Sequence, residues 1–131
     1  MQSTAPTSGL RILLAEDNAD SAESMAHVLR AAGHSVRVVA DGVQAVTAAL
    51  QDPPDVVLLD IGLPLLDGWE VASRIHQGLG ERPCALIAIS GYSQPDDQVQ
   101  SRQAGIHLHL AKPVDPEKLQ TLLSQLHQPG R

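Results

Sequence analysis

VVLLDIGLPLLDGWE, residues 56–70, is the most informative stretch of this chain. It begins with four apolar residues in a row, a pattern typical of a β-strand that is buried on both faces of a parallel sheet. Asp60 ends that run, although burying an unpaired carboxylate costs several kcal/mol. The stretch therefore predicts a core strand that ends on an acidic residue, whose presence there needs an explanation.

On both sides of this stretch, short apolar runs alternate with helical patterns. The runs predict five strands, at residues 10–15, 35–40, 55–60, 84–90 and 106–111. Apolar residues at helical spacing predict a helix after each strand, with Gly33 and the pair Pro53-Pro54 as stops. Asp41, and Asp115 with Pro116, are expected to begin two of these helices.

This alternation indicates an α/β fold. Successive strand–helix units form a parallel sheet with helices on both faces, and right-handed crossovers leave few topologies. We expect a doubly wound, flavodoxin-like sheet of five strands in the order 2-1-3-4-5. The 131 residues indicate one domain, predicted over 10–127, with disordered tails at 1–9 and 128–131.

Composition narrows the classes of function. The net charge of −6 argues against direct contact with nucleic acid, which needs a basic face. The single cysteine, Cys84, allows no intrachain disulfide and suits a reducing cytoplasm. No apolar run approaches the ~20 residues that span a membrane, and the first residues lack the features of a signal peptide. We therefore expect a cytoplasmic protein without a membrane partner.

The predicted topology brings reactive side chains together. All strands of a parallel sheet end at one edge, and ligands bind there where the strand order reverses, which is between the first and third strands. The residues at or just after the strand ends are Glu16-Asp17, Asp60, Ser90 and Lys112-Pro113. Asp60 is therefore expected at the mouth of a site and not in the core.

Three neighbouring carboxylates repel one another by about 4 kcal/mol per pair at 4 Å. A hard cation such as Mg²⁺ (or Mn²⁺), together with Lys112, would relieve this repulsion. The same groups could hold a phosphoryl group, with Ser90 as a further contact to its oxygens. Asp60, central at the edge, is the expected nucleophile that forms an aspartyl phosphate.

From Leu10 to about Leu126, this ordered set resembles the receiver domain of two-component response regulators, the CheY-like family. The resemblance implies that Asp60 accepts a phosphoryl group from a histidine kinase or a phosphotransfer domain. It also implies a Mg²⁺ site made of Asp17, Asp60 and the backbone carbonyl of Gly62, with Glu16 acting through water. Glu16 stands where the family more often has Asp, which keeps the charge on a longer arm.

The resemblance assigns further roles. Ser90 and Lys112 would contact the phosphoryl group, and the bond before Pro113 would be cis. Gly62 and Tyr92 occupy positions that tune dephosphorylation in the family. Ser90 and His109 would form the switch, with a histidine where the family usually has Tyr or Phe.

The resemblance also implies an output face for a downstream protein, made of the fourth helix, the fifth strand and the fifth helix. It spans roughly residues 94–103, 107–110 and 116–126. The residues expected to be exposed there are Gln98, Arg102, His107 and His109.

Simpler interpretations remain for single residues. Asp60 could merely end a strand, Glu16-Asp17 could cap the first helix, and Asp67 is a better helix cap than a ligand. His107 and His109 share a strand face, but no further zinc ligands are in view. Cys84 is expected to be a small core residue.

The same residues bear on two other functions. A Mg²⁺-dependent phosphatase of the haloacid-dehalogenase type needs a second Asp where this chain has Gly62, and a flavodoxin-like electron carrier needs a hydroxyl-rich phosphate loop. The expected function is a signalling switch that catalyses only its own phosphorylation and dephosphorylation. It could be a stand-alone regulator or the receiver portion of a hybrid sensor histidine kinase.

Overall fold

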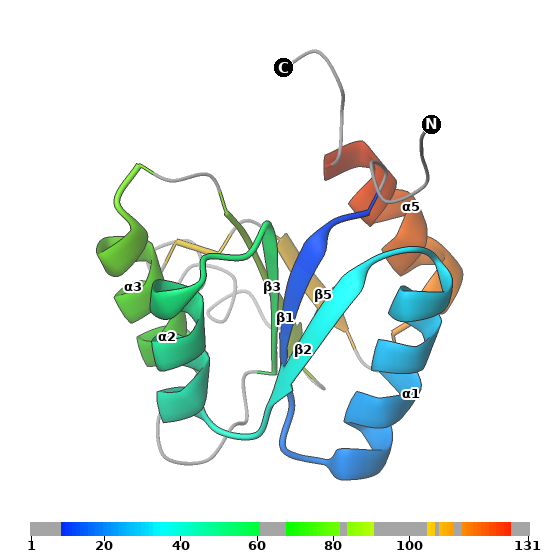
Figure 1. Ribbon diagram of the computed structural model, residues 1–131, viewed down its shortest axis with the longest axis horizontal. Helices are drawn as coiled ribbons and strands as arrows, with labels where there is room; N and C mark the ends of the chain where they lie inside the picture. The colour runs from blue at the N-terminus through cyan, green and yellow to red at the C-terminus, as the bar shows by residue number, and fades with distance from the viewer. Residues whose placement is uncertain are drawn as a thin grey trace.

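The computed structural model describes residues 9–60, 68–81, 84–90, 105–106, 108–111 and 114–126. These residues form a parallel sheet in the predicted order β2-β1-β3-β4-β5 (Figure 1). The strands are β1 (Arg11–Ala15), β2 (Ser35–Val39), β3 (Val56–Asp60), β4 (Ala85–Ser90) and β5 (Leu108–Ala111). The helix expected between β4 and β5, the expected tail at 128–131 and the expected tail at 1–9 except for Gly9 lie outside the described residues.

Helices cover both faces of the sheet. They are α1 (Ala19–Ala31), α2 (Gly42–Gln51), α3 (Gly68–Leu79) and α5 (Pro116–Leu126). In Figure 1, α1 and α5 lie on one side of the strands, and α2 and α3 lie on the other. The doubly wound α/β architecture predicted from the alternating pattern is confirmed. None of the helices among the described residues combines the length and the apolar character that a membrane span requires.

β3 occupies the centre of the sheet, between β1 and β4. All five of its residues are buried. Successive side chains of a strand point to opposite faces, so Val57 and Leu59 join the core under α2 and α3, whereas Val56 and Leu58 join the core under α1 and α5. The uninterrupted apolar run of this strand is thus explained by burial on both faces.

Three of the predicted helix starts and stops are confirmed among the described residues. The Asp41 side chain accepts a hydrogen bond from the backbone N–H of Gln44 at 2.8 Å at the start of α2. Asp115 accepts one from the N–H of Glu117 at 2.9 Å, one residue before α5 begins at Pro116. Gly33, with a φ of +102°, follows the end of α1. Asp67, expected to begin α3, lies outside the described residues.

The strand boundaries differ slightly from those predicted. β5 starts at Leu108, not at residue 106. Ile106 is buried against the core under α2 and α3 but belongs to no strand. An apolar residue signals burial, and in this case the burial comes from packing beside the sheet, not from strand pairing. The other expected strands extend one residue too far at one end.

The strands begin at one edge of the sheet, called here the amino edge. Ion pairs connect the segments that meet at this edge. Asp52, which follows α2, binds Arg37 at 2.7 Å through one carboxylate oxygen and Arg11 through the other. Asp55 accepts a hydrogen bond from the backbone N–H of Arg11 at 2.8 Å. These contacts tie the segment before β3 to the start of β1 and to β2.

Candidate functional site

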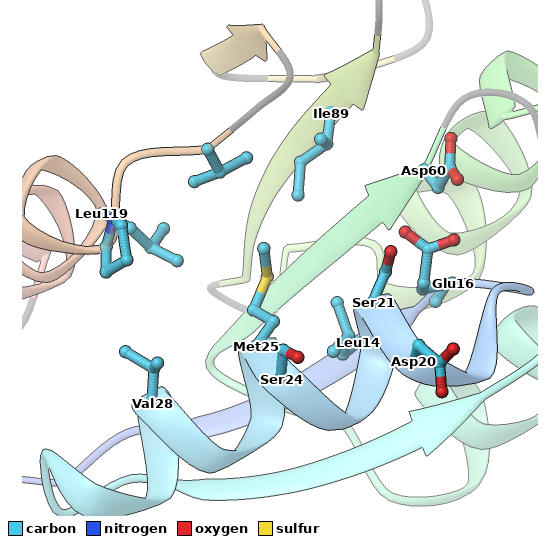
Figure 2. Close-up of a pocket in the computed structure, with 13 residues that line it drawn as sticks. Leu14, Glu16, Asp20, Ser21, Ser24, Met25, Val28, Asp60, Ile89 and Leu119 are labelled. Carbon is cyan, nitrogen blue, oxygen red and sulfur yellow. The ribbon is translucent and has the colours of Figure 1, made fainter.

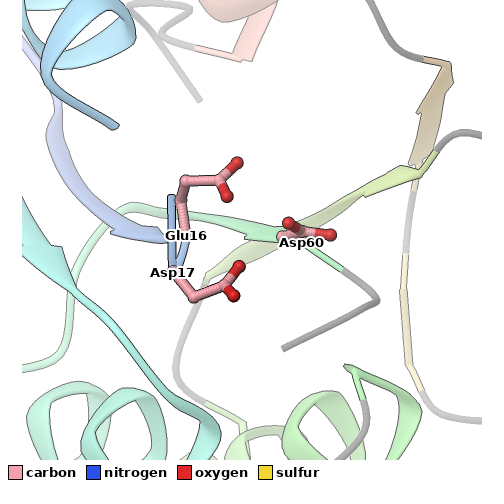
Figure 3. A group of neighbouring side chains, drawn as sticks. All are labelled: Glu16, Asp17 and Asp60. Carbon is pink, nitrogen blue, oxygen red and sulfur yellow. The ribbon is translucent and has the colours of Figure 1, made fainter. Parts of the chain in front are cut away.

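The three predicted acidic residues meet at the opposite edge, where the strands end, called here the carboxyl edge. β1 pairs directly with β3, with Ala15 opposite Leu59, so the residues that follow Ala15 lie beside Asp60. One carboxylate oxygen each from Glu16, Asp17 and Asp60 lies within 4.8 Å of the others (Figure 3). Residues 16 and 60 are thus brought together by strand pairing alone.

The three carboxylates differ in burial. Asp60 is only 7% exposed, and it is the one buried polar or charged residue among those that the structure describes. Glu16 is half-buried and Asp17 is exposed. As expected, Asp60 lines a pocket and belongs to neither core cluster, although its side chain is more deeply buried than a position at the mouth of a site suggests. The reason is that β3 is the central strand, with neighbours on both sides up to its last residue.

The loop between β1 and α1 holds Glu16 in place. The backbone N–H of Asn18 donates to Oε2 of Glu16 at 3.0 Å. Asn18 is also the N-cap of α1, because its Oδ1 accepts the N–H of Ser21 at 2.9 Å. The alternative that Glu16-Asp17 caps this helix is therefore wrong. Sequence reasoning missed Asn18, although Asn is among the residues preferred as N-caps.

A pocket of about 640 Å³ runs from the acidic cluster between α1 and α5 (Figure 2). Its lining residues are Leu14, Ala15, Glu16, Asp20, Ser21, Ser24, Met25, Val28, Asp60, Ile89, Val114, Pro116 and Leu119. Figure 2 shows the carboxylates of Glu16 and Asp60 at one end, Val28 and Leu119 at the other, and Met25 between them. The sequence did not point to this pocket, since its walls come from five separate segments of the chain.

The donor set fits a hard cation. All three ligand candidates are carboxylates, and oxygen ligands suit Mg²⁺ and Mn²⁺ better than zinc, which prefers His and Cys in structural sites. Like charges at this separation repel by several kcal/mol at the effective dielectric of a protein surface. A divalent ion between them would offset that repulsion and would stabilise the arrangement.

Several predicted site residues lie outside the described residues: Gly62, Tyr92, Lys112, Pro113 and His107, together with Gln98 and Arg102 of the expected output face. Ser90 is the last residue of β4, as predicted, but its side chain also lies outside the description.

His109 lies in β5 opposite Ala88 of β4. Ala88 belongs to the core under α2 and α3, and neighbours in register point to the same face, so His109 faces that side of the sheet. It is half-buried, which corrects the expectation that it is exposed. The position is compatible with a side chain that turns between core and surface.

Cys84 precedes β4 and packs against the core under α2 and α3. Burial, with a smaller contribution from the charge of Asp55, raises the pKa of its thiol to about 11. The thiol is therefore protonated at neutral pH and is a poor nucleophile. This agrees with its interpretation as a small residue packed against the core.

Comparison with known proteins gives a family for this arrangement. The model of the response regulator receiver domain matches residues 12–124. The transcriptional regulatory protein TcrA of Mycobacterium tuberculosis is 33% identical over 123 residues, which cover 94% of this chain and 48% of TcrA. The DNA-binding response regulator MtrA of Mycolicibacterium paratuberculosis is 33% identical over 109 residues, which cover 83% of this chain and 47% of MtrA. The chain thus spans about half the length of these curated relatives.

Solved structures agree with this match. The receiver domain of the sensor histidine kinase PA1611 from Pseudomonas aeruginosa is 36% identical, with a TM-score of 0.82 over 90% of this chain and 97% of that domain. That structure has a magnesium ion coordinated in its active site cleft. The chemotaxis protein CheY4 of Vibrio cholerae, 23% identical, has a TM-score of 0.84 over 90% of this chain and 98% of CheY4, which supports the fold.

Proposed function

The chain belongs to the response regulator receiver domain family, and we propose that it is a phosphoryl-accepting switch of a two-component phosphorelay, with Asp60 as the acceptor. The observation that carries this proposal is the meeting of Glu16, Asp17 and Asp60 at the end of the central strand. A buried carboxylate beside two others is costly for stability, and the cost is understandable if the group reacts.

The chemistry would be a transfer between a phosphohistidine and Asp60. A carboxylate oxygen of Asp60 attacks phosphorus, the new P–O bond forms as the P–N bond breaks, and the histidine nitrogen leaves with the bonding electrons and then takes up a proton. Ser90 and Lys112 would contact the phosphoryl oxygens, Gly62 and Tyr92 would affect the later hydrolysis, and Pro113 would shape the loop that carries Lys112. The domain catalyses only its own phosphorylation and dephosphorylation.

Mg²⁺ (or Mn²⁺) would be held by Asp17, Asp60 and the backbone carbonyl of Gly62, with Glu16 acting through water. Bound there, the ion would neutralise charge on the phosphoryl oxygens. The hydrogen bond from Asn18 to Glu16 supports the indirect role of Glu16, because one of its oxygens is already occupied by the loop. The magnesium ion in the related PA1611 domain supports the choice of metal.

The phosphoryl donor is proposed to be a histidine kinase or phosphotransfer domain that approaches Asp60 along the pocket between α1 and α5. Apolar side chains such as Met25 and Val28 would contact the donor protein, and the acidic end would receive its phosphohistidine. Small side chains, Ser21 and Ser24, leave this side of α1 open.

The downstream protein is proposed to bind a different face from the phosphoryl donor. Phosphorylation adds about two negative charges, and Ser90 and His109 would pass this change to the face formed by the fourth helix, β5 and α5. His109 already faces the α2/α3 side of the sheet in a half-buried position, which supports a rotation between two states. The net charge of −6 supports a protein partner on this face and no direct nucleic-acid contact.

Two kinds of parent protein fit the comparisons. The curated relatives are transcriptional regulators about twice as long as this chain, whereas the PA1611 domain comes from a sensor histidine kinase. The comparisons therefore favour a receiver portion of a longer protein, either a regulator or a hybrid kinase. A stand-alone regulator is retained beside it as a proposal, with the cytoplasm as the proposed location and one domain over 10–127.

Phosphorylation by a small donor tests the proposal. The protein is incubated with phosphoramidate and Mg²⁺, and the phosphorylated fraction is measured by intact-protein mass spectrometry. We expect one added phosphoryl group, its loss in Asp60→Asn, and suppression by EDTA. Asp52→Asn is the matched control, because it removes a carboxylate from the amino edge and leaves the acidic cluster intact. Labelling that persists in Asp60→Asn would sink the assignment.

A further inference from the structure

The turn between α1 and β2 holds the residue at which the chain enters the sheet. The backbone N–H of Leu10 donates a hydrogen bond to Nδ1 of His34 at 3.0 Å, across 24 residues of sequence. The carbonyl of Leu10 accepts the N–H of Ser35 at 2.9 Å. Both backbone groups of Leu10 are therefore bonded to the same turn, one of them through a titratable side chain.

The position of His34 follows from the way α1 ends. The N–H of Gly33 bonds to the carbonyl of Arg30 at 3.0 Å, and the N–H of His34 bonds to the carbonyl of Leu29 at 3.2 Å. With Gly33 at a φ of +102°, these two bonds form a Schellman motif, which fixes the backbone of the residue after the glycine. His34 is half-buried, so its ring is held close to Leu10.

Gly9 shows how closely the entering chain approaches this turn. A Cβ atom at Gly9 would lie 2.2 Å from the carbonyl oxygen of Gly33, which is well inside contact distance. Position 9 therefore requires a glycine, because a side chain would collide with the backbone of Gly33. The segment Gly9–Leu10 lies against the turn through one close backbone approach and two hydrogen bonds.

We propose that His34 is a pH-dependent latch for the segment Gly9–Leu10. A neutral imidazole accepts at one nitrogen and donates at the other, so the bond from Leu10 requires the proton of His34 to be on Nε2. In the imidazolium form both nitrogens are donors, and the N–H of Leu10 then faces a second N–H. The latch therefore closes with the neutral ring and opens when the ring takes up a proton.

The charged side chains of the surrounding elements have partners of their own, such as the carbonyl of Val36 for Arg30. The charged residues at the carboxyl end of α1, in or at the start of β1 and β2, and before β3 are Arg30, Arg11, Arg37, Asp52 and Asp55. Asp52 is shared by two of the arginines, and Asp55 accepts the backbone N–H of Arg11. The part of α5 that returns toward this edge, residues 119–126, carries no charged side chain.

The latch and the acidic cluster lie at opposite ends of β1 and are separate from one another. His34 lies at the amino edge, whereas Glu16 and Asp17 follow β1 at the carboxyl edge. The closed state binds fewer protons than the open state, so it is favoured at neutral pH and lost as the pH falls through the ordinary histidine range near 6.5 and below. The segment Gly9–Leu10 is thus held at neutral pH and released in acid.

Amide hydrogen exchange of Leu10 tests this proposal. NMR measures its protection factor from pH 5 to 8, corrected for the intrinsic exchange rate, together with the ¹⁵N shifts of the His34 ring. We expect Nδ1 to be unprotonated at pH 7.5, and the protection of Leu10 to fall about fivefold as the ring is protonated, the loss of one ordinary hydrogen bond. Protection in β3, at Leu58, should stay constant and serves as the check that the fold persists.

Three variants separate the latch from a general effect of pH. In His34→Asn, the side-chain oxygen takes the place of Nδ1 and cannot be protonated, so Leu10 should stay protected at every pH. In His34→Ala, Leu10 should be poorly protected throughout. His27→Gln alters an exposed histidine of α1, the helix that precedes the turn, and should keep the wild-type profile. A pH response that survives in His34→Asn, or a proton on Nδ1 at pH 7.5, would overturn the proposal.

Discussion

The two edges of the sheet treat carboxylates in opposite ways. At the amino edge, Asp52 is shared by Arg11 and Arg37, and Asp55 accepts a backbone N–H. At the carboxyl edge, Glu16, Asp17 and Asp60 are gathered within 4.8 Å of one another. The first arrangement compensates charge and stabilises the fold, whereas the second concentrates charge where the strands end.

Burial sharpens the contrast. Asp52 is exposed, and its pKa is held below the usual range chiefly by the hydrogen bond from Arg11, with a further contribution from Arg37. Exposed ion pairs of this kind add little to stability. Asp60, by comparison, is 7% exposed beside two other acids. Substitutions of these acids at the amino edge should therefore change the stability of the fold slightly. Substitutions of the acids at the carboxyl edge should change the affinity for Mg²⁺ strongly.

The largest effect is expected for metal binding. Asp17→Asn should raise the Kd for Mg²⁺ by about a hundredfold or more, because it removes a proposed direct ligand, and Glu16→Gln should raise it by about tenfold, as for residues that act through the surrounding shell. Isothermal titration of Mg²⁺ measures both. Asp52→Asn, with the same loss of charge at the other edge, should leave the Kd unchanged. Equal effects of the first two variants would contradict the division between direct and indirect ligands.

The next effect concerns the thiol at the amino edge. With a pKa of about 11 in place of 9.0, Cys84 should have about a hundredfold less thiolate at pH 8 than a free cysteine. Its alkylation by iodoacetamide should be slower by a similar factor and should rise with pH only toward 11. Because the pKa is raised by folding, the corresponding stability is complete below pH 9.0 and is lost as the pH rises through about 11. Rapid alkylation at pH 8 in the native state would show that Cys84 is accessible as thiolate.

A smaller effect is expected at the loop beside the metal site. Asn18→Ala removes the N-cap of α1 and should lower the free energy of unfolding by about 1 kcal/mol. Urea denaturation measures this loss. Asn18→Asp, which keeps a capping oxygen, should restore most of it. The backbone N–H that bonds to Glu16 is present in all three proteins, so the Asn18→Ala protein should retain Mg²⁺ binding. A cap that contributes nothing to stability would leave the urea midpoint unchanged.

The smallest effect is expected for the ion pairs of the amino edge. Asp52→Asn should lower the urea midpoint slightly at pH 7, since the pairs are exposed. The lowered pKa of Asp52 means that its contribution is present above its ordinary value of 3.8 and is lost as the pH falls below it. The wild type and Asp52→Asn should thus converge in stability at low pH. A difference that grows as the pH falls would contradict this assignment.

Local patterns in the sequence predicted most of the fold. The apolar run 56–59 predicted a doubly buried strand, Asp41 and Asp115 predicted helix starts, and the alternation of strands and helices predicted the order of the sheet. The convergence of Glu16, Asp17 and Asp60 followed from that order, because parallel strands end at one edge. Each of these inferences depends either on residues that are close together in the sequence or on the order of the strands in the sheet.

The remaining features depend on contacts between distant segments, for which a linear pattern carries no signal. The burial of Asp60, the pocket between α1 and α5, and the packing of Ile106 beside the sheet all arise from how separate elements meet. Asn18 and Asp17 are both good N-caps by residue type, and only the path of the chain after β1 selects Asn18. In the same way, His34 reaches Leu10 because the end of α1 and the start of β1 come together in space. Residue type and spacing thus determine which elements form, whereas packing determines which side chains are buried and which distant residues meet.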